Sequence, residues 1–340
     1  MTLKRPKILV VGSLVMDLIV STGKFPGSGE TVFGKTFSTA PGGKGANQAM
    51  QARRMGAEVT MVGKVGNDGF GRELTESARA CGMNVQHLLV DSQHSSAVGN
   101  IILEVAEGEK SKNRIIVVPG ANMAITPADV AFLEEEISHY DMVLLQLEIP
   151  MAINELVAEL AYKNGVKVML NSAPYAPISD KLLRCLSYIS PNEHEAADMT
   201  GVPIRKNGKE ANVDDVKAAI KVLLGKGVEN VIITLGSSGA VVATRDSFVL
   251  KPCVDIVKVV DPTAAGDSFV GSFCTAVCAG LSHEQALDVA NYTATITVSR
   301  MGAQPSLPTL AEVVALMKQD GYTGFDLSIL DALLSVPPKG

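Results

Sequence analysis

The sequence contains no dense run of lysine or arginine, and its formal net charge at pH 7 is −6. This charge argues against nucleic acid and anionic membranes as partners. No apolar run reaches membrane-spanning length, and the N-terminus lacks the apolar stretch and cleavage site of a signal peptide. The five cysteines form no Cys-x-x-Cys pair and the five histidines are scattered. We therefore expect a cytoplasmic protein with reduced thiols and without a cysteine-based metal site or a histidine-centred triad.

Length and composition indicate one large α/β domain. The chain has 340 residues, of which 46% are hydrophobic and 19% are charged, so it can bury a sizeable core. After Pro127, predicted helices, the first over residues 128–138, alternate with short apolar segments at residues 142–147, 166–170 and 230–234. Continuously apolar strands are typical of a parallel sheet that is covered on both faces. We therefore predict an α/β fold, a mainly parallel sheet with helices on both faces.

Two further segments favour strands but fall outside this alternation. They are residues 30–40 and the pair of runs at residues 98–105 and 114–118. These segments could pair to form a small separate sheet, which would be a candidate lid. Near the C-terminus, the apolar piece at residues 325–334 could pack as a helix or serve as a contact arm.

Small residues lead into a predicted helix at Asp261-Pro-Thr-Ala-Ala-Gly-Asp267. Ala264, Ala265 and Gly266 have almost no side chain, and the backbone N–H groups at a helix start carry partial positive charge. The stretch therefore suits an anion such as a phosphate. Asp267 could cap this helix, or it could act as a general base that takes a proton from a hydroxyl group.

A second glycine-rich turn, Pro41-Gly-Gly-Lys-Gly-Ala-Asn47, opens another predicted helix. Its double glycine would let the backbone approach a small polar ligand closely. Lys44 and Asn47 would then supply side-chain donors. The alternative is a plain tight turn with a solvated lysine.

Polar residues stand where several predicted strands end. Asp17 follows the strand at residues 7–11 and a turn at Gly12, and it either faces a ligand or is an exposed loop charge. No G-x-G-x-x-G follows this strand, so a dinucleotide fingerprint is absent. The carboxyl ends of parallel strands share one edge of the sheet, where ligands bind. A nucleotide and a small substrate could meet there in a crevice formed by Asp17, Glu148, Asn192, Glu195, Thr234, Gly236 and Asp267.

The two glycine-rich motifs resemble the two signatures of the ribokinase-like (PfkB) carbohydrate kinases. The resemblance runs from about residue 7 to about residue 318. Other segments match the family in the same order, namely Gly12-Ser13, Gln146-Leu-Glu148, Pro191-Asn-Glu-His-Glu195, Thr234-Leu-Gly236 and Arg300-Met-Gly-Ala-Gln-Pro-Ser306.

The resemblance implies an ATP-dependent kinase that phosphorylates the primary hydroxyl of a small sugar, with D-ribose and D-ribose 5-phosphate as the expected substrate and product. Asp267 would be the base that deprotonates this hydroxyl. Ala264, Ala265 and Gly266 would form the anion hole for the transferring phosphoryl group. The sugar would be held by Ser13, Val15, Asp17, Gly43, Lys44, Asn47, Glu148 and Asp267.

The resemblance also implies ATP and two cations as cofactors. Asn192 and Glu195 would act near the phosphates and a water-bound Mg²⁺. The ATP site would be lined by Thr234, Gly236, Gly239, Gly266 and Asn291. A K⁺ ion beside the anion hole would reinforce its N–H dipoles. The implied K⁺ ligands, several through backbone carbonyls, are Asp261, Thr263, Thr297, Arg300, Gly302 and Ser306.

The implied domain organisation is a ribokinase-like kinase domain at residues 1–318 and a C-terminal extension at residues 319–340. The lid would come from about residues 20–41 and 97–119. In this family the lid closes over the sugar and pairs two subunits, so a homodimer through the lid is expected. Closure would exclude water and limit wasteful hydrolysis of ATP.

Two residues depart from the family pattern. Ribose-specific members usually carry an asparagine where this chain has Val15, and an apolar residue cannot hydrogen-bond a sugar hydroxyl. A hydroxyl buried there without a partner would cost about 1–3 kcal/mol. The sugar 2-deoxyribose is therefore a competing substrate, unless water or Asp17 satisfies the hydroxyl. The second departure, Pro262, removes one N–H and fixes φ, and we expect the loop to tolerate it.

Other functions on the same fold stay open. The acceptor could be a ketose or a nucleoside, although the set of Gly43, Lys44 and Asn47 favours a small free sugar. The chain could also be a non-catalytic sensor of a sugar or nucleotide, because fold alone does not fix function. A sensor need not keep a base, so the intact loop before Asp267 favours catalysis.

Overall fold

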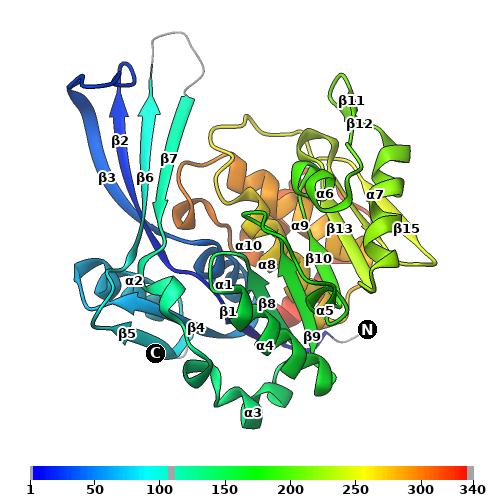
Figure 1. Ribbon diagram of the computed structural model, residues 1–340. Helices are drawn as coiled ribbons and strands as arrows, with labels where there is room; N and C mark the ends of the chain where they lie inside the picture. The colour runs from blue at the N-terminus through cyan, green and yellow to red at the C-terminus, as the bar shows by residue number, and fades with distance from the viewer. Residues whose placement is uncertain (1–2, 106–111, 335–340) are drawn as a thin grey trace.

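A nine-stranded sheet forms the centre of the computed structural model, which describes residues 3–105 and 112–334 (Figure 1). Its strand order is β15-β14-β13-β10-β9-β8-β1-β4-β5. The strands from β13 to β5 run parallel, and β14 and β15 add an antiparallel hairpin at one edge. The predicted mainly parallel sheet is confirmed. Its strands are β1 (Lys7–Val11), β4 (Glu58–Gly66), β5 (Asn84–Asp91), β8 (Met142–Gln146), β9 (Lys167–Asn171), β10 (Tyr188–Ser190), β13 (Asn230–Thr234), β14 (Ala240–Ala243) and β15 (Phe248–Lys251).

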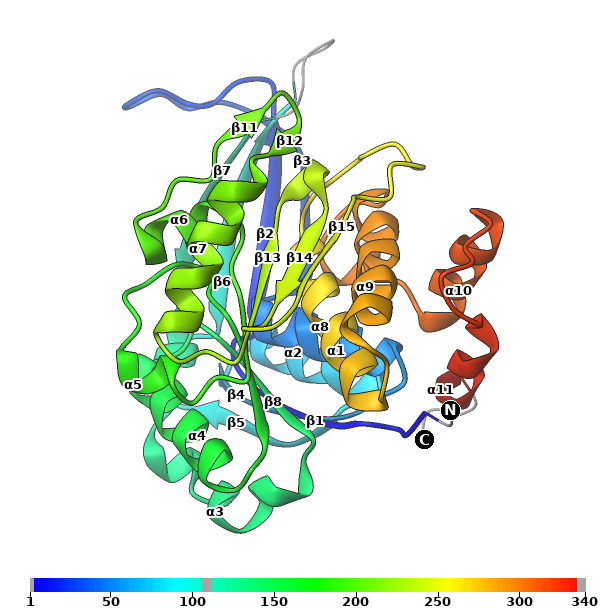
Figure 2. The same ribbon diagram turned by 90° about the vertical axis from the view of Figure 1, so that its right-hand side faces the viewer.

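Helices cover both faces of this sheet, as Figure 2 shows. One layer contains α1 (Lys44–Arg54), α2 (Gly69–Ala80), α8 (Ala265–Ala279), α9 (His283–Val298) and α10 (Leu310–Gln319). The other layer contains α3 (Leu133–Glu136), α4 (Met151–Lys163), α5 (Asp180–Leu183), α6 (Glu193–Thr200) and α7 (Val213–Gly225). A two-stranded hairpin, β11 (Lys206–Asn207) and β12 (Glu210–Ala211), precedes α7.

Strand β1 shows how the two layers share the sheet. Ile8 and Val10 belong to the core on the side of α1 and α8, whereas Leu9 and Val11 belong to the core on the side of α4 and α7. All four side chains are fully buried. Successive side chains of a strand point to opposite faces, so a strand buried on both faces has to be continuously apolar.

A separate four-stranded sheet extends away from the helical layers (Figure 1). Its strand order is β3-β2-β6-β7, so the two β-rich segments join one small sheet as predicted, but β2 lies between them and they do not pair directly. Strand β2 was not expected, and Asp17 lies within this strand rather than in a loop. Residues 106–111 of the predicted lid lie outside the described residues. The strands are β2 (Val15–Thr22), β3 (Gly34–Gly42), β6 (Ala97–Glu104) and β7 (Lys112–Val118).

The continuous helix predicted over residues 128–138 is wrong. The segment consists of a 3₁₀ turn at Pro127–Val130, the short helix α3 and a second 3₁₀ turn at Ile137–His139. Val130, Leu133 and Ile137 are buried in this arrangement. The same residues would be buried by one continuous helix, so their spacing could not separate the two conformations.

The C-terminal segment packs on the layer that contains α10. It forms a 3₁₀ turn at Leu327–Leu330 and the helix α11 (Asp331–Leu334). Leu327, Leu330 and Leu333 are buried in the core of this layer. Residues 335–340 of the predicted extension lie outside the described part of the chain. Among the helices of the described part, none is both long and apolar enough to cross a membrane.

Candidate active site

The Asp267 carboxylate lies in the first turn of α8, and only 7% of the residue is exposed. Helix α8 begins after Ala264, and the Asp267 side chain does not cap it. Instead, Asn47 Nδ2 donates to Asp267 Oδ2 and Gln48 Nε2 donates to Asp267 Oδ1, each at 3.0 Å. The capping alternative is therefore wrong, and the carboxylate links the two glycine-rich motifs.

The loop in front of Asp267 presents open backbone. Ala264 has φ 60°, and it is the one non-glycine residue with positive φ in the described part of the chain. This conformation costs about 1–3 kcal/mol for a residue with a side chain, and such strain clusters at functional sites. Of the N–H groups that open α8, that of Ala265 donates to the carbonyl of Pro262 at 3.2 Å, and that of Gly266 has no acceptor among the described residues. A Cβ added at Gly266 would meet no atom within 4 Å, so the space beside this residue is open.

The second motif joins the ends of β1 and β8 to the start of α1. Ser13 Oγ donates to Glu148 Oε2 at 2.5 Å, and the backbone N–H of Lys44 donates to the same oxygen at 3.1 Å. Gly45 N–H donates to Ser13 Oγ at 3.2 Å. Gly43 has φ 92°, and a Cβ there would lie 2.7 Å from the backbone nitrogen of Val15. The turn therefore needs glycine for its conformation and for this close approach.

Lys44 is partly buried among carboxylates and is not a solvated surface lysine. Burial disfavours its charged form, but the carboxylates of Asp267, Glu148 and Glu195 outweigh burial and raise the pKa of Lys44 above its ordinary value. The lysine therefore stays positively charged beside the Asp267 carboxylate. A cation in this place can attract a phosphate group.

Asp17 lies between two glycines of the small sheet. A Cβ at Gly42 would lie 2.7 Å from Asp17 Oδ2, and one at Gly99 would lie 2.6 Å from Asp17 Oδ1. Burial and the nearby charge of Glu148 raise the pKa of Asp17 to about 6. Val15 lies two residues earlier on the same strand, so its buried side chain points to the same face as Asp17.

Asn192 and Glu195 contact one another at the start of α6. Asn192 N–H donates to Glu195 Oε2 at 3.0 Å and Asn192 Nδ2 donates to Glu195 Oε1 at 2.9 Å. Ser172 Oγ donates to Glu195 Oε2 at 3.1 Å. In return, Asn192 Oδ1 accepts the N–H of Glu195 at 2.9 Å and so caps the helix. A bridge from Asn192 to Thr234 places the pair beside the end of β13.

The predicted nucleotide residues lie around the turn after β13. Gly236 and Gly239 have positive φ in this turn, at 59° and 94°. A Cβ at Gly239 would lie 2.0 Å from the carbonyl oxygen of Lys251, which shows how closely the end of β15 packs on the turn. Asn291 on α9 donates to the carbonyl of Pro252 at 3.3 Å. A cavity of about 350 Å³ adjoins the turn, and its lining includes Leu235, Ser237, Ser238, Pro252 and Cys253.

Of the predicted K⁺ ligands, Thr263 and Gly302 contact Asp261, whereas the hydroxyls of Thr297 and Ser306 donate to the carbonyls of Thr293 and Ala303. Asp261 Oδ1 accepts Thr263 N–H at 2.9 Å and the Thr263 hydroxyl at 2.6 Å, and Asp261 Oδ2 accepts Gly302 N–H at 2.9 Å. The Arg300 guanidinium pairs with Glu312 at 2.6 Å, which leaves the Arg300 backbone carbonyl as its candidate donor. Carboxylate, hydroxyl and carbonyl oxygens suit a hard cation. In the described residues no group of three or more His, Cys, Asp or Glu forms a metal cluster.

Sequence reasoning missed Gln48, Gly42 and Gly99. Gln48 follows Asn47 directly, but the spacing indicated only a helical position. Gly42 and Gly99 matter because they have no Cβ beside Asp17, and Gly99 is distant in the sequence. Their role depends on how β2, β3 and β6 pair, which no local pattern reveals.

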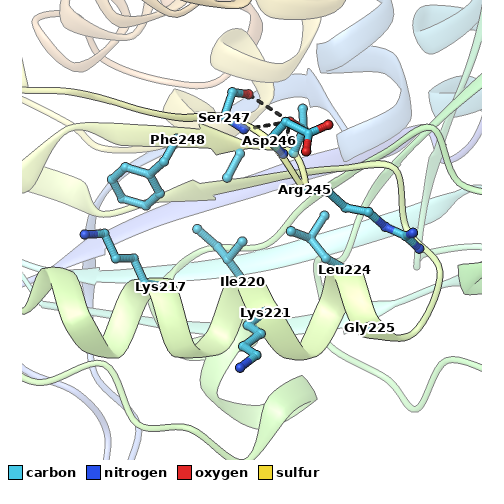
Figure 3. A pocket seen from close by; sticks show the side chains of 11 residues that line it. Lys217, Ile220, Lys221, Leu224, Gly225, Arg245, Asp246, Ser247 and Phe248 are labelled. Carbon is cyan, nitrogen blue, oxygen red and sulfur yellow. Dashed lines mark hydrogen bonds between the residues drawn. The ribbon is translucent and has the colours of Figure 1, made fainter.

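A larger cavity, of about 610 Å³, lies between α7 and the β14–β15 hairpin (Figure 3). Ala243, which lines it, pairs with Val231 near the start of β13, whereas Thr234 ends that strand. The cavity is therefore at the opposite end of the sheet from the predicted site. Figure 3 also shows that Lys221 and Arg245 point away from one another, so these cations do not converge on one ligand.

Comparisons with known proteins agree with this geometry. Residues 5–310 match the model of the pfkB family carbohydrate kinases. A ribokinase of Schizosaccharomyces pombe is 39% identical over 315 residues, which cover 90% of this chain and 96% of the relative. A deoxyribokinase of Salmonella typhi is 33% identical over 306 residues, with coverage of 90% and 96%.

A solved structure shows the same fold. It is Arabidopsis thaliana ribokinase complexed with ribose and ATP, with a TM-score of 0.84, 32% identity, and coverage of 93% of this chain and 99% of that chain. The family match and the relatives extend over most of the sequence, including both glycine-rich motifs. The chain therefore belongs to the pfkB family of carbohydrate kinases.

Proposed function

We propose that this chain transfers the γ-phosphoryl group of ATP to the primary hydroxyl of D-ribose and forms D-ribose 5-phosphate. The observation that carries the proposal is the buried Asp267 carboxylate in the first turn of α8, directly after Gly266, beside which the space is open. In this proposal a proton acceptor and an anion hole would lie within one helical turn. The ribokinase relative and the neighbour that holds ribose and ATP support the choice of acceptor and donor.

Phosphoryl transfer depends mainly on positioning and on stabilisation of charge. Asp267 would accept the proton of the attacking hydroxyl, because each of its oxygens receives one amide hydrogen bond and keeps further accepting capacity. The N–H groups of Ala264, Ala265 and Gly266 would stabilise the charge on the transferring group. Lys44, which is charged and close to Asp267, would stabilise the same charge.

The sugar would lie between the small sheet and the start of α1. Asp17 and Glu148 are acceptors for sugar hydroxyls, and Lys44 is a donor. Asn47 Oδ1 is buried and has no hydrogen-bond partner among the described residues. A buried polar atom of this kind needs a partner, and a sugar hydroxyl would supply it. Ser13 would act indirectly, since its hydroxyl holds Glu148.

Two cations would complete the site. Mg²⁺, when bound with ATP, neutralises charge on the phosphates. Asn192 and Glu195 would hold its water ligands, while Thr234, Gly236, Gly239 and Asn291 would line the nucleotide. K⁺ would be held by oxygen atoms of Asp261, Thr263, Thr297, Gly302 and Ser306 and by the carbonyl of Arg300.

We also propose that the four-stranded sheet is a lid and that two lids pair in a homodimer. Large apolar side chains are exposed on this sheet, including Phe37, Ile115, Ile116, Val117 and Val118. Exposed apolar patches of this kind mark interaction sites. Light scattering should give twice the mass of one chain, and a monomer at micromolar concentration would count against the pairing. The use of ATP and a free sugar fits a cytoplasmic location, with residues 1–318 as the kinase domain and 319–340 as its extension.

One observation favours a second substrate, 2-deoxyribose. Val15 presents an apolar, buried side chain on the face that carries Asp17, and one relative is a deoxyribokinase. If Val15 faces the sugar, a hydroxyl that lost its partner there would cost about 1–3 kcal/mol. Val15→Asn should then raise the ratio of kcat/KM for ribose over 2-deoxyribose about 5- to 100-fold. An unchanged ratio would show that Val15 does not determine specificity.

The test of the proposed function is ADP release from purified protein with Mg-ATP, with and without K⁺. The acceptors are D-ribose, 2-deoxy-D-ribose, D-fructose and adenosine. Ribose as the best acceptor supports the proposal, and 2-deoxyribose as the best supports the second candidate. Turnover with none of them would support a sensor of sugar or nucleotide instead.

A further inference from the structure

A buried chain of amide side chains leads from Asp267 to the end of β8. Gln48 Nε2 donates to Asp267 Oδ1 at 3.0 Å, and Gln146 Nε2 donates to Gln48 Oε1 at 2.8 Å. Asn154 Nδ2 donates to the backbone oxygen of Gln146 at 2.8 Å. Gln48, Gln146 and Asn154 are all 0% exposed. The chain therefore connects α8, α1, β8 and α4 without reaching solvent or a ligand.

The hydrogen bonds give this chain a direction. An amide side chain has an NH₂ group on one side and an oxygen on the other. Because the Asp267 carboxylate only accepts hydrogen bonds, the NH₂ group of Gln48 faces it, and the oxygen of Gln48 accepts from Gln146 on the other side. A rotated Gln48 would place its oxygen against the carboxylate and its NH₂ group against that of Gln146. Both contacts would be unfavourable, so one orientation of Gln48 is fixed.

Asp267 is thereby held at both oxygens. Asn47 donates to Oδ2 and Gln48 donates to Oδ1, so rotation of the carboxylate would break one bond or both. Asn47 is also a proposed ligand of the sugar, whereas Gln48 is fully buried and is not among the residues proposed to bind sugar or ATP. The effects of the two amides on catalysis can therefore be separated.

We propose that Gln48, oriented by Gln146, is a positioning residue that keeps the Asp267 carboxylate aimed at the sugar hydroxyl. This proposal rests on the proposed role of Asp267 as the base. Supporting residues of this kind act by holding the reacting group within a fraction of an ångström of its working position. Their loss lowers the rate of the chemical step and leaves binding of the substrates intact.

The direct test is Gln48→Met, which keeps the length of the side chain and removes the donor. We expect kcat to fall about 10- to 100-fold, with KM for ribose and for ATP within about twofold of wild type. A merely structural role would not separate kcat from KM in this way. Thermal unfolding measured on the same samples establishes that the variant is folded.

Gln51→Met is the matched control. Gln51 lies one turn further along α1, is also 0% exposed, and donates its Nε2 to the carbonyl of Pro308 at 3.0 Å. This variant loses a buried amide hydrogen bond on the same helix but does not touch Asp267. Its kcat should stay within about twofold of wild type. An equal fall of kcat in Gln51→Met and Gln48→Met would overturn the proposal.

Gln146→Met provides a second, independent variant. It removes the donor that orients Gln48, so kcat should fall about 3- to 10-fold with unchanged KM. Wild-type kcat in folded Gln48→Met overturns the proposal; if Gln48→Met does not fold, wild-type kcat in Gln146→Met does so. Asp267→Asn is measured in parallel. Full activity in Asp267→Asn would refute the base itself, whereas an inactive Asp267→Asn beside a fully active Gln48→Met refutes only the positioning role.

Discussion

Replacing Gly99 with alanine tests whether Asp17 binds the sugar. Gly99 lies on β6 beside β2, and its added Cβ would be 2.6 Å from Asp17 Oδ1. Ordinary contact begins at 3.4 Å, so the carboxylate has to move by about 0.8 Å. The backbone of Gly99 does not have a positive φ, so alanine adds no strain of its own. The substitution should therefore act through Asp17.

The expected size of the effect follows from the hydrogen bond that is disturbed. A bond to a charged group contributes about 1.5–3 kcal/mol, and about 1.4 kcal/mol corresponds to a tenfold change in affinity. We therefore expect KM for ribose to rise about 10- to 100-fold in Gly99→Ala. The fall in kcat should be smaller, because Asp267 and its loop are not changed.

Gly34→Ala is the control for this substitution. Gly34 lies on β3 of the same sheet, and its added Cβ would lie 3.2 Å from Val20 Cγ1 without reaching Asp17. Its KM should stay within about twofold of wild type. The assay is steady-state ADP release over a range of ribose concentrations, with calorimetric titration of ribose alongside. An unchanged KM and ribose affinity in folded Gly99→Ala would refute the reasoning.

Three further predictions concern charge, packing and capping. Burial and Glu148 raise the pKa of Asp17 to about 6, so protonation below this pH removes a charged acceptor for a sugar hydroxyl. Calorimetry should therefore show the affinity of wild type for ribose falling from pH 7 to pH 5, and no such fall in Asp17→Asn. Leu330 is 1% exposed, so Leu330→Ala should lower the free energy of unfolding by about 2–5 kcal/mol in urea titrations while kcat stays unchanged. An unaltered unfolding midpoint would contradict the packing of this segment. Asn192→Ser keeps a residue that caps α6 but removes the amide that holds Glu195, so the free energy of unfolding should change by less than about 1 kcal/mol while kcat falls at least about tenfold. A wild-type kcat in this variant would leave Asn192 with a capping role alone.

The parallel sheet could be predicted because its strands carry their own signal. Residues such as Leu9 and Val10 are buried on opposite faces, and a continuous apolar run is the direct consequence. Strand β2 lacks this signal. It carries Asp17 near its start, and most of its residues are only partly buried, so Gly12 and Asp17 indicated a turn. Its pairing with β6 depends on a segment far along the chain.

The site could be predicted as a set of positions but not as a set of contacts. The small residues before Asp267 indicated an anion-binding loop, and the double glycine before Lys44 indicated a close approach of the backbone. The sequence could not show that Asp267 does not cap its helix, because Asn47 and Gln48 reach the carboxylate only in the folded chain. The oxygen of Gln48 accepts in turn from Gln146, at the end of strand β8.

The central claim is that Asp267 is the base of an ATP-dependent sugar kinase. The most direct measurement compares wild type with Asp267→Asn by ³¹P NMR of ribose and Mg-ATP mixtures, with calorimetric binding of both ligands. The account predicts that wild type forms ribose 5-phosphate, while Asp267→Asn binds both ligands and turns over about 10²- to 10⁴-fold more slowly. Formation of ribose 5-phosphate by Asp267→Asn at the wild-type rate would contradict it.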